Sequence, residues 1–311
     1  MTSSVQGRDG ASVRWNRRVR LVLADVDETI AGLYEPASPA MLRALGRFLG
    51  DGGRLFLITG GSLQRVTSGI TDGIPRVMRR GVLVAPVSGA EVWGFTTRGA
   101  VRRRPFVSRY EETFTPDMKR RWRAVSAQVL AEFGLRPHAV RPPARFHREV
   151  GHDPLDVMVD DRGSQITFEF VNGRDLRVAV VERAAELLRE ARLPVTPRLA
   201  SVFALNMTIE GVSKESAVRQ VLESDAILAS VGLTSADVAA PHALEVWGDD
   251  FSAANGGSDL LMSRAVAPAV RSIDFRDEDP TDFPAELNIV LWDGAQRLHD
   301  GLLEYLESRR A

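Results

Sequence analysis

The sequence predicts an α/β fold with a Rossmann-like parallel sheet, into which a second, α+β segment is inserted. An apolar run at 19–27, a helix pattern at 38–53 and a second apolar run at 54–62 give the order strand, helix, strand. A crossover of this kind makes the two strands parallel. Ser38 followed by Pro39 indicates the start of the helix, because serine caps a helix N-terminus and proline fits the first turn.

The pattern changes after residue 88 and returns to α/β near 211. Between these limits lie hairpin-like strands and a strand of alternating character at 165–171. The predicted parts are a flexible tail at 1–18, a core at 19–87 and 201–311, and an inserted domain at 88–200. Further expected elements are helices near 116–133, 175–193, 211–223, 257–265 and 294–308, and strands at 243–250 and 270–275.

The composition excludes several classes of protein. The 311 residues include no cysteine, which rules out disulfides, thiolate metal sites and a cysteine nucleophile. The formal net charge of -1 gives no overall field that would attract nucleic acid or a membrane surface. No apolar run is long enough to span a bilayer. We expect a cytoplasmic protein that binds neither nucleic acid nor membranes, and the sequence leaves its oligomeric state open.

Two carboxylates directly follow the first apolar run. Asp25 and Asp27 lie where a buried strand should end, and residues two apart on a strand face the same side. Thr59 follows the second run in the same way. Because parallel sheets bind ligands beyond the carboxyl ends of their strands, these residues predict a site at that edge. The competing interpretation is that the Asp pair only caps a turn or a helix.

Lysine is rare in this chain, which uses arginine for nearly every cation. Among 40 Lys and Arg residues only Lys119 and Lys214 are lysines. A lysine retained against this bias is expected where a compact point charge is required, because a guanidinium is broad and planar. Lys214 opens a helix in the stretch GVSKES, which favours it as the functional lysine. A solvated residue of the first helical turn is the alternative.

Four segments in this order resemble the motifs of the haloacid dehalogenase-like (HAD) phosphohydrolase superfamily. They are DVDET from Asp25, ITGGS around Thr59, GVSKES around Lys214, and WGDD with Asp249 and Asp250. In position and α+β character the insertion is similar to the C2-type cap of a subgroup that includes sugar phosphatases, trehalose-phosphate phosphatases and phosphomannomutases. The resemblance implies a HAD core with a cap domain that selects the substrate.

The resemblance also implies catalytic roles. Asp25 attacks phosphorus and becomes a phosphoaspartate, and Asp27 protonates the leaving oxygen and then activates water. Thr59 binds the phosphoryl group, and Lys214 contacts both the nucleophile and the phosphate. At Gly61 the chain departs from the family, since many members carry an arginine there.

Mg²⁺ is the cofactor that the resemblance implies, because carboxylates together with substrate phosphate oxygens suit this ion. The implied ligands are Asp25, the main-chain carbonyl of Asp27, Asp249 and Asp250. The fourth motif fits the family imperfectly, and the later Asn255 and Asp259 are similar to another variant of it with inserted residues. Which second acid supports the metal therefore stays open at this point.

Substrate contacts are expected from two regions. Thr29 and Gly60 belong to the motifs of the core, whereas Arg141, Arg145 and Arg148 lie in a Pro- and Arg-rich stretch of the insertion. These arginines would meet an anionic or hydroxyl-rich group, and a solvated arginine face is the alternative interpretation.

The expected function is that of a Mg²⁺-dependent phosphoric monoester hydrolase acting on a small phosphorylated metabolite, with a sugar phosphate as the expected substrate. Its partner would then be a small phosphate ester, cleaved through an aspartyl-phosphate intermediate. The alternatives are a phosphomannomutase-like phosphomutase, a receiver-type signalling module and a catalytically silent binding protein on the same fold. Receivers are small single domains with the phosphorylated Asp on a later strand, so the inserted domain argues against that class.

Overall fold

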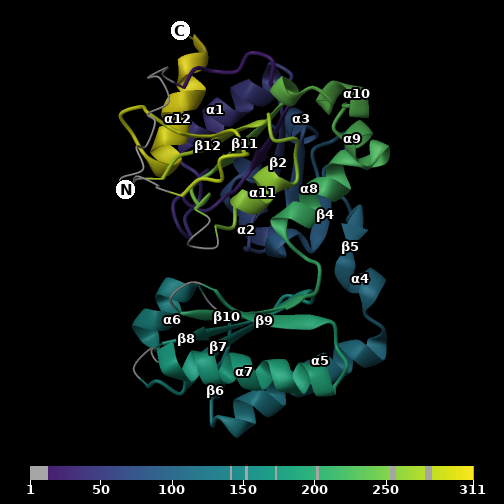
Figure 1. Ribbon diagram of the computed structural model, residues 1–311, viewed down its shortest axis with the longest axis vertical. Helices are drawn as coiled ribbons and strands as arrows, with labels where there is room; N and C mark the ends of the chain where they lie inside the picture. The colour runs from purple at the N-terminus through teal and green to yellow at the C-terminus, as the bar shows by residue number, and fades with distance from the viewer. Residues whose placement is uncertain are drawn as a thin grey trace, which may run out of the picture.

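Two β-sheets organise the chain, and each lies in a lobe of its own (Figure 1). The computed structural model describes residues 13–140, 142–150, 153–171, 174–200, 203–252, 257–276 and 282–310. The larger lobe contains both described ends of the chain, and the smaller lobe is formed by its middle. No helix in these described ranges is both long and apolar enough to cross a membrane.

The sheet of the larger lobe has eight strands in the order β13-β12-β11-β1-β2-β3-β4-β5. Pairing is parallel from β13 to β3 and antiparallel for β4 and β5. This confirms the predicted α/β class with a parallel sheet. The strands are β1 Leu21–Ala24, β2 Arg54–Ile58, β3 Val82–Ala85, β4 Glu91–Gly94, β5 Val107–Ser108, β11 Leu244–Gly248, β12 Arg271–Asp274 and β13 Ile289–Leu291.

Helices cover both faces of this sheet, as the uniformly buried strands require. The helix α1 Pro39–Gly50 packs beside α12 Leu298–Glu307 on one face, and α8 Lys214–Leu222 packs beside α11 Leu260–Arg264 on the other. Ser38 caps α1 as predicted, since its side chain accepts a hydrogen bond from the amide of Met41 at 3.1 Å. The remaining helical segments are α2 Leu63–Gly69, η1 Thr71–Gly73, α3 Arg76–Arg79, η2 Val87–Gly89, α9 Asp225–Ser230, α10 Ser235–Val238, η3 Pro241–Ala243 and η4 Ser308–Arg310.

The smaller lobe is a five-stranded sheet in the order β6-β7-β8-β10-β9 with helices on its outer face. Figure 1 shows this sheet between the larger lobe and the helices α5 and α7. Its inner face is therefore turned toward the carboxyl ends of the core strands. The elements are α4 Arg109–Thr113, α5 Pro116–Glu132, β6 Arg136–His138, α6 Pro143–Glu149, β7 Asp156–Asp161, β8 Gln165–Phe170, α7 Arg174–Glu190, β9 Val195–Ala200 and β10 Ala204–Ile209.

The limits of the insertion differ from the predicted 88–200. The strands β4 and β5 extend the large sheet, because β4 turns back antiparallel onto β3 through η2. At the other end, β9 and β10 pair with each other and with β8, so the smaller sheet continues to Ile209. The inserted lobe thus begins after Ser108 and ends at Ile209. A hairpin and an edge strand look the same in sequence whichever sheet they join.

The flexible tail predicted for 1–18 is wrong for residues 13–18. The indole of Trp15 packs against Tyr305, Phe48 and Trp247, with ring centroids 5.0, 5.9 and 6.4 Å away. The amide of Asn16 also donates to the Tyr305 hydroxyl at 3.3 Å. Apolar and hydrogen-bond contacts therefore fix this segment, while residues 1–12 lie outside the described ranges.

A buried carboxylate joins the sheet to α12 at the end remote from the strand ends that carry the motifs. Glu245 is fully buried and accepts hydrogen bonds from Arg271 Nε at 3.0 Å, Trp247 Nε1 at 2.8 Å and the Tyr305 hydroxyl at 3.0 Å. These three donors share Glu245 as their acceptor. Loss of the Glu245 side chain therefore removes a hydrogen-bond partner from each of them.

We predict that Glu245→Ala lowers the free energy of unfolding by about 3 kcal/mol or more, because it removes the acceptor of a buried ionic network. Urea unfolding followed by circular dichroism measures the change. Glu307→Ala, an exposed glutamate on α12, is the control and should change stability by less than about 0.5 kcal/mol. Equal stability of the two variants would show that the network contributes nothing.

Candidate active site

The predicted site residues converge at the carboxyl-end edge of the large sheet. Asp25 follows β1, Thr59 follows β2 and Asp249 follows β11, and these three strands are neighbours. Lys214 is the first residue of α8, whose start is fixed by a capping box between Ser213 and Ser216. The order of the strands therefore brings together motifs that are far apart in the sequence.

An ammonium group lies between two carboxylates at the centre of the site. Lys214 Nζ is 2.6 Å from Asp25 Oδ1 and 2.6 Å from Asp259 Oδ1. All three residues are buried, with exposed fractions of 6%, 8% and 0% in that order. Lysine suits this position better than arginine, because its compact ammonium group can contact two acids at once.

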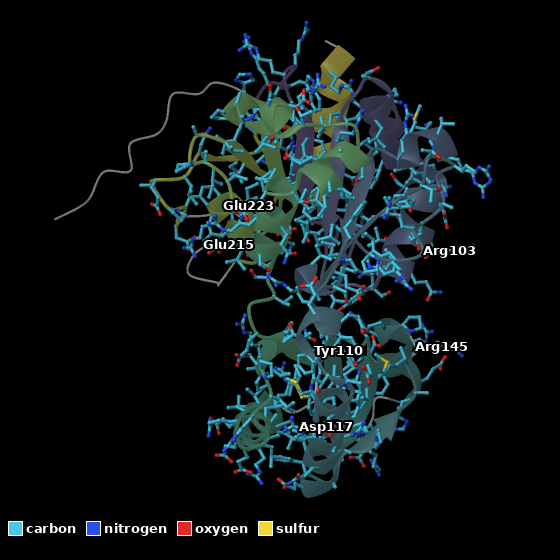
Figure 2. All side chains as sticks on the ribbon, turned by 90° about the vertical axis from the view of Figure 1, so that its right-hand side faces the viewer. Arg103, Tyr110, Asp117, Arg145, Glu215 and Glu223 are labelled. Atoms are coloured by element: carbon cyan, nitrogen blue, oxygen red, sulfur yellow. The ribbon has the colours of Figure 1, made fainter. Side chains whose placement is uncertain are left out.

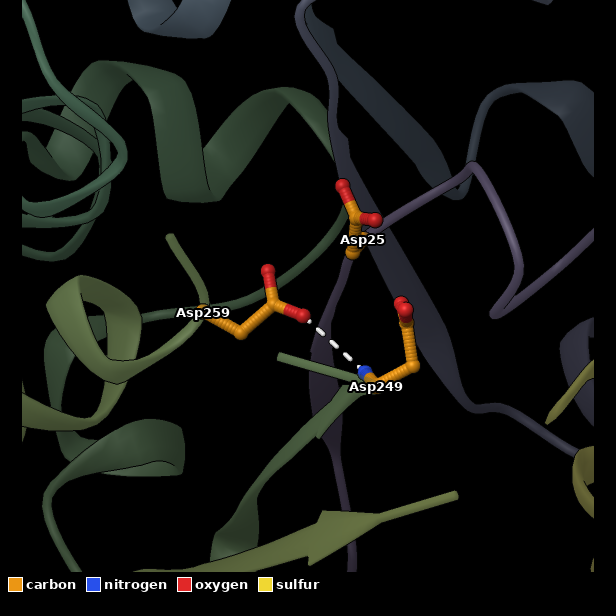
Figure 3. Close-up of side chains that lie close together, drawn as sticks. All are labelled: Asp25, Asp249 and Asp259. Atoms are coloured by element: carbon orange, nitrogen blue, oxygen red, sulfur yellow. Dashed lines mark hydrogen bonds between the residues drawn. The ribbon is translucent and has the colours of Figure 1, made fainter. Parts of the chain in front are cut away.

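Asp259 holds the site through its second oxygen as well. Its Oδ2 accepts the backbone amides of Asp249 at 3.0 Å and Asp250 at 3.1 Å, and Figure 3 shows the first of these bonds. The carboxylate lies directly over Gly248, where a Cβ atom would come within 2.3 Å of Oδ2. Glycine at 248 is therefore required for this close approach.

Three carboxylates form a cluster that could bind a metal ion. Asp25, Asp249 and Asp259 each offer an oxygen, and these oxygens lie within 4.8 Å of one another (Figure 3). One lysine compensates only part of their charge. A buried all-oxygen cluster with excess negative charge has the chemistry of a site for a hard divalent cation.

Burial and mutual repulsion raise the pKa values of two of these acids. Burial raises the pKa of Asp25 from 3.8 to about 7, with Lys214 opposing and Asp259 adding to the shift. Burial, followed by the charges of Asp259 and Asp25, raises the pKa of Asp249 to about 8. Burial alone would lower the pKa of Lys214, but the charges of Asp25 and Asp259 raise it. A bound cation would favour the ionised carboxylates.

Asp27 has partners of its own and does not join this cluster. Its Oδ2 accepts from Arg65 Nη1 at 3.2 Å and from the Thr59 hydroxyl at 3.3 Å, and Arg65 Nη2 donates to Oδ1. Arg65 occupies space above Gly61, where a Cβ atom would lie 3.3 Å from its Nη1. The arginine that the motif lacks at 61 is thus supplied from α2, one turn later.

A cleft between the lobes opens onto Asp27. It has a volume of about 260 Å³ and is lined by core residues that include Tyr34, Gly60 and Arg65. The opposite wall is the inner face of the smaller sheet. Arg162, in the turn between β7 and β8, crosses the cleft and donates from Nη1 to the Gly60 carbonyl at 2.8 Å. Gly60 thus lines the cleft, in keeping with the expectation for that residue.

Two predicted residues make contacts other than the expected ones. Thr29 is fully buried and donates to Asp249 Oδ1 at 2.9 Å, which makes it a positioning residue for the acid. Asp250 lies outside the carboxylate cluster, and its Oδ2 accepts the amide of Ser258 at 2.8 Å. Asp259 is instead the acid that completes the cluster with Asp25 and Asp249.

The predicted cap arginines do not line the cleft where the structure describes them. Arg145 and Arg148 are exposed on α6, and Arg145 pairs with Glu149 at 2.7 Å. Figure 2 shows Arg145 at the side of the smaller lobe, near its upper edge. The short helix α6 leaves both arginines exposed, which no spacing in the sequence reveals. Arg141 lies outside the described residues.

Three residues of the site were not predicted in their roles. Asp259 had a weak signal, its similarity to a displaced family motif. Arg65 had an indirect signal, because position 61 is a glycine where many members of the family carry an arginine, and Arg65 is the next arginine in the sequence. Arg162 had only its place in the turn before the alternating strand β8.

A parallel core with an acid at the end of its first strand, a buried lysine and an inserted lobe above them defines the haloacid dehalogenase-like fold with a cap. Solved structures with this arrangement match nearly the whole chain. Among them is a haloacid dehalogenase-like hydrolase from Bacteroides thetaiotaomicron, with a TM-score of 0.58, 14% identity and coverage of 93% of this chain and 98% of that one.

Two further neighbours have named substrates. The C-terminal domain of trehalose-6-phosphate phosphatase from C. albicans has a TM-score of 0.56 at 12% identity and covers 94% of both chains. The sucrose-phosphatase from Synechocystis sp. PCC6803, solved with sucrose and phosphate, has a TM-score of 0.52 at 14% identity and covers 93% of this chain and 96% of that one. No family model and no curated protein matches the sequence. At these identities the likeness establishes the fold.

We predict that the raised pKa values of Asp25 and Asp249 make the metal-free protein less stable as pH rises from about 5 to 8. With a raised pKa the folded chain binds more protons than the unfolded chain in this window, so each step up in pH favours unfolding. Urea unfolding in EDTA at several pH values measures it. Asp249→Asn lacks one titrating group, so its stability relative to wild type should increase with pH; a constant difference would contradict the prediction.

Proposed function

We propose that this protein is a Mg²⁺-dependent phosphatase that hydrolyses a sugar phosphate through an intermediate on Asp25. The observation that carries the proposal is the buried ion pair of Asp25 with Lys214, because Asp27, two residues after Asp25, lines the cleft below the inserted lobe. The ammonium orients one carboxylate oxygen and supplies positive charge next to it. A carboxylate held in this way can act as a nucleophile toward phosphorus.

The two acids of the DVDET segment divide the reaction between them. A carboxylate oxygen of Asp25 forms a bond to phosphorus as the bond to the leaving oxygen breaks, and Asp27 gives that oxygen its proton. Water then attacks the phosphoaspartate, Asp27 takes the proton of the water, and phosphate leaves Asp25. The two acids differ in their partners, since Lys214 contacts Asp25 and not Asp27, whereas Arg65 contacts Asp27 and not Asp25.

The donor set fits Mg²⁺. Asp25, Asp249 and Asp259 would hold the ion, and Thr29 orients Asp249 by its hydrogen bond. Bound there, Mg²⁺ would supply positive charge to the transferring phosphoryl group. An incomplete fourth motif would favour the catalytically silent binding protein, and the carboxylate cluster that Asp259 completes supports the enzyme instead.

The preference for a sugar phosphate has two supports. Two neighbours of the same fold are named for trehalose 6-phosphate and sucrose phosphate. The polar side chains that line the cleft of this chain, Thr167 and Asn206 among them, suit a hydroxyl-rich leaving group. Release to water makes the protein a phosphatase, and transfer to a second hydroxyl would make it a phosphomutase; analysis of the products separates the two.

We predict that Asp25→Asn lowers the turnover of 4-nitrophenyl phosphate with Mg²⁺ by about 10³-fold or more, since the nucleophile is lost. Release of 4-nitrophenol measures it. Asp117→Asn is the control, because Asp117 is exposed on α5 at the far end of the smaller lobe (Figure 2), and its turnover should equal that of wild type. Wild-type turnover in Asp25→Asn would refute the proposed mechanism.

We predict that Asp249→Asn weakens Mg²⁺ binding by at least about tenfold, whereas Asp250→Asn changes it little. The neighbours form a matched pair, since only Asp249 belongs to the carboxylate cluster. Isothermal titration calorimetry with MgCl₂ gives the affinities without reference to catalysis. Equal losses in both variants, or a larger one in Asp250→Asn, would place the ion elsewhere.

A further inference from the structure

The inner face of the smaller sheet presents a row of polar side chains to the cleft. On β8 the residues Gln165, Thr167 and Glu169 alternate with apolar residues that pack toward α5 and α7. These three polar residues are buried, with exposed fractions of 2%, 8% and 5%, and all of them line the cleft. Burial of so many polar groups on one strand requires partners, within the protein or in a ligand.

Most of this row is satisfied by a chain of hydrogen bonds along the sheet. Gln165 Nε2 donates to the Thr167 hydroxyl at 2.9 Å, and that hydroxyl donates to Asn206 Oδ1 at 2.8 Å across to β10. The hydroxyl of Thr208 donates to Gln165 Oε1 at 3.5 Å. The chain fixes the side chains in place, so the wall of the cleft is organised before a ligand arrives.

Glu169 stands at the end of this row as a buried carboxylate. Its Oε1 lies 3.0 Å from Nε2 of His147, a residue of α6. The charge of Glu169 acts across the cleft: after burial, it is the largest cause of the raised pKa of Tyr34, on the opposite wall. The carboxylate is thus held rigidly and directed at the space between the lobes.

The arginines that line this cleft, among its described residues, are both paired with acids. Arg65 is bound to Asp27, and Arg162 Nε is 2.6 Å from Asp160 Oδ2. Glu169 therefore adds negative charge to a wall that offers no unpaired guanidinium there. An anionic group beside a buried carboxylate is strongly disfavoured, whereas hydroxyl groups can donate to it.

From this arrangement we propose that Glu169 is a specificity-determining residue that selects a leaving group rich in hydroxyls and free of any anionic group. The proposal rests on the proposed phosphatase function and narrows its substrates. Hydroxyls of a neutral sugar or polyol would donate to Glu169 and to the amide oxygens of the row. A substrate with a carboxylate or a second phosphate at that end would be rejected by charge.

Two substrates that differ only at the end remote from phosphorus test the proposal. D-glucitol 6-phosphate ends in a hydroxymethyl group and D-gluconate 6-phosphate ends in a carboxylate on the same six-carbon chain. We predict that kcat/KM of the wild-type protein with Mg²⁺ favours the glucitol ester by about tenfold or more, the size of a charge-assisted hydrogen bond. Glu169→Gln should reduce this ratio toward one, and Glu169→Asp, which keeps the charge, should retain a preference.

The controls separate this proposal from the function on which it rests. Glu182→Gln, on the outer helix α7, should keep the wild-type ratio, because Glu182 is exposed behind the sheet. All variants should hydrolyse 4-nitrophenyl phosphate at similar rates, since that ester carries no hydroxyls for Glu169. A wild-type preference for the gluconate ester, an equal ratio in wild type and Glu169→Gln, or failure of both esters while 4-nitrophenyl phosphate is cleaved would overturn the role of Glu169. Failure with 4-nitrophenyl phosphate as well would instead refute the phosphatase.

Discussion

The contact of Lys214 with Asp25 and Asp259 is the interaction on which the rest of the site depends. It joins the end of β1, the first turn of α8 and the segment before α11, three parts of the chain that are far apart in sequence. Because the lysine and both acids are buried, each charge is costly without the others. The arrangement of α8 and α11 over the sheet is thereby coupled to the position of the proposed nucleophile.

The same contact leaves an excess of negative charge that gives the site its chemistry. The hydrogen bonds of the Lys214 ammonium go to Asp25 and Asp259. Asp249 Oδ1 accepts its hydrogen bond from the hydroxyl of Thr29. Burial and this excess charge raise the pKa values of Asp25 and Asp249, and a cation bound between the acids would favour their ionised forms. Asp27 has separate partners in Arg65 and Thr59, so the two acids of the DVDET segment lie in different surroundings.

The proposed function divides chemistry and selectivity between the two lobes. The carboxylates, Lys214 and Arg65 belong to the larger lobe, whereas the polar row with Glu169 belongs to the smaller sheet, which has an apolar core of its own. The lobes meet across the cleft at the bond from Arg162 to the Gly60 carbonyl. An inserted domain of this kind can change its inner face without disturbing the proposed catalytic residues of the larger lobe.

The sequence by itself determined the class of fold, the strand-end acids and Lys214, because apolar periodicity, caps and a rare residue type are local signals. Tertiary structure alone decided which sheet β4, β5, β9 and β10 would join, since strand pairing depends on partners distant in the chain. Tertiary structure also decided that Asp259 and not Asp250 belongs to the carboxylate cluster, and that Arg65 contacts Asp27. In the smaller lobe it left Arg145 exposed and placed Glu169 at the cleft. Those outcomes depend on the direction of side chains relative to other elements, and direction is fixed only when the elements pack together.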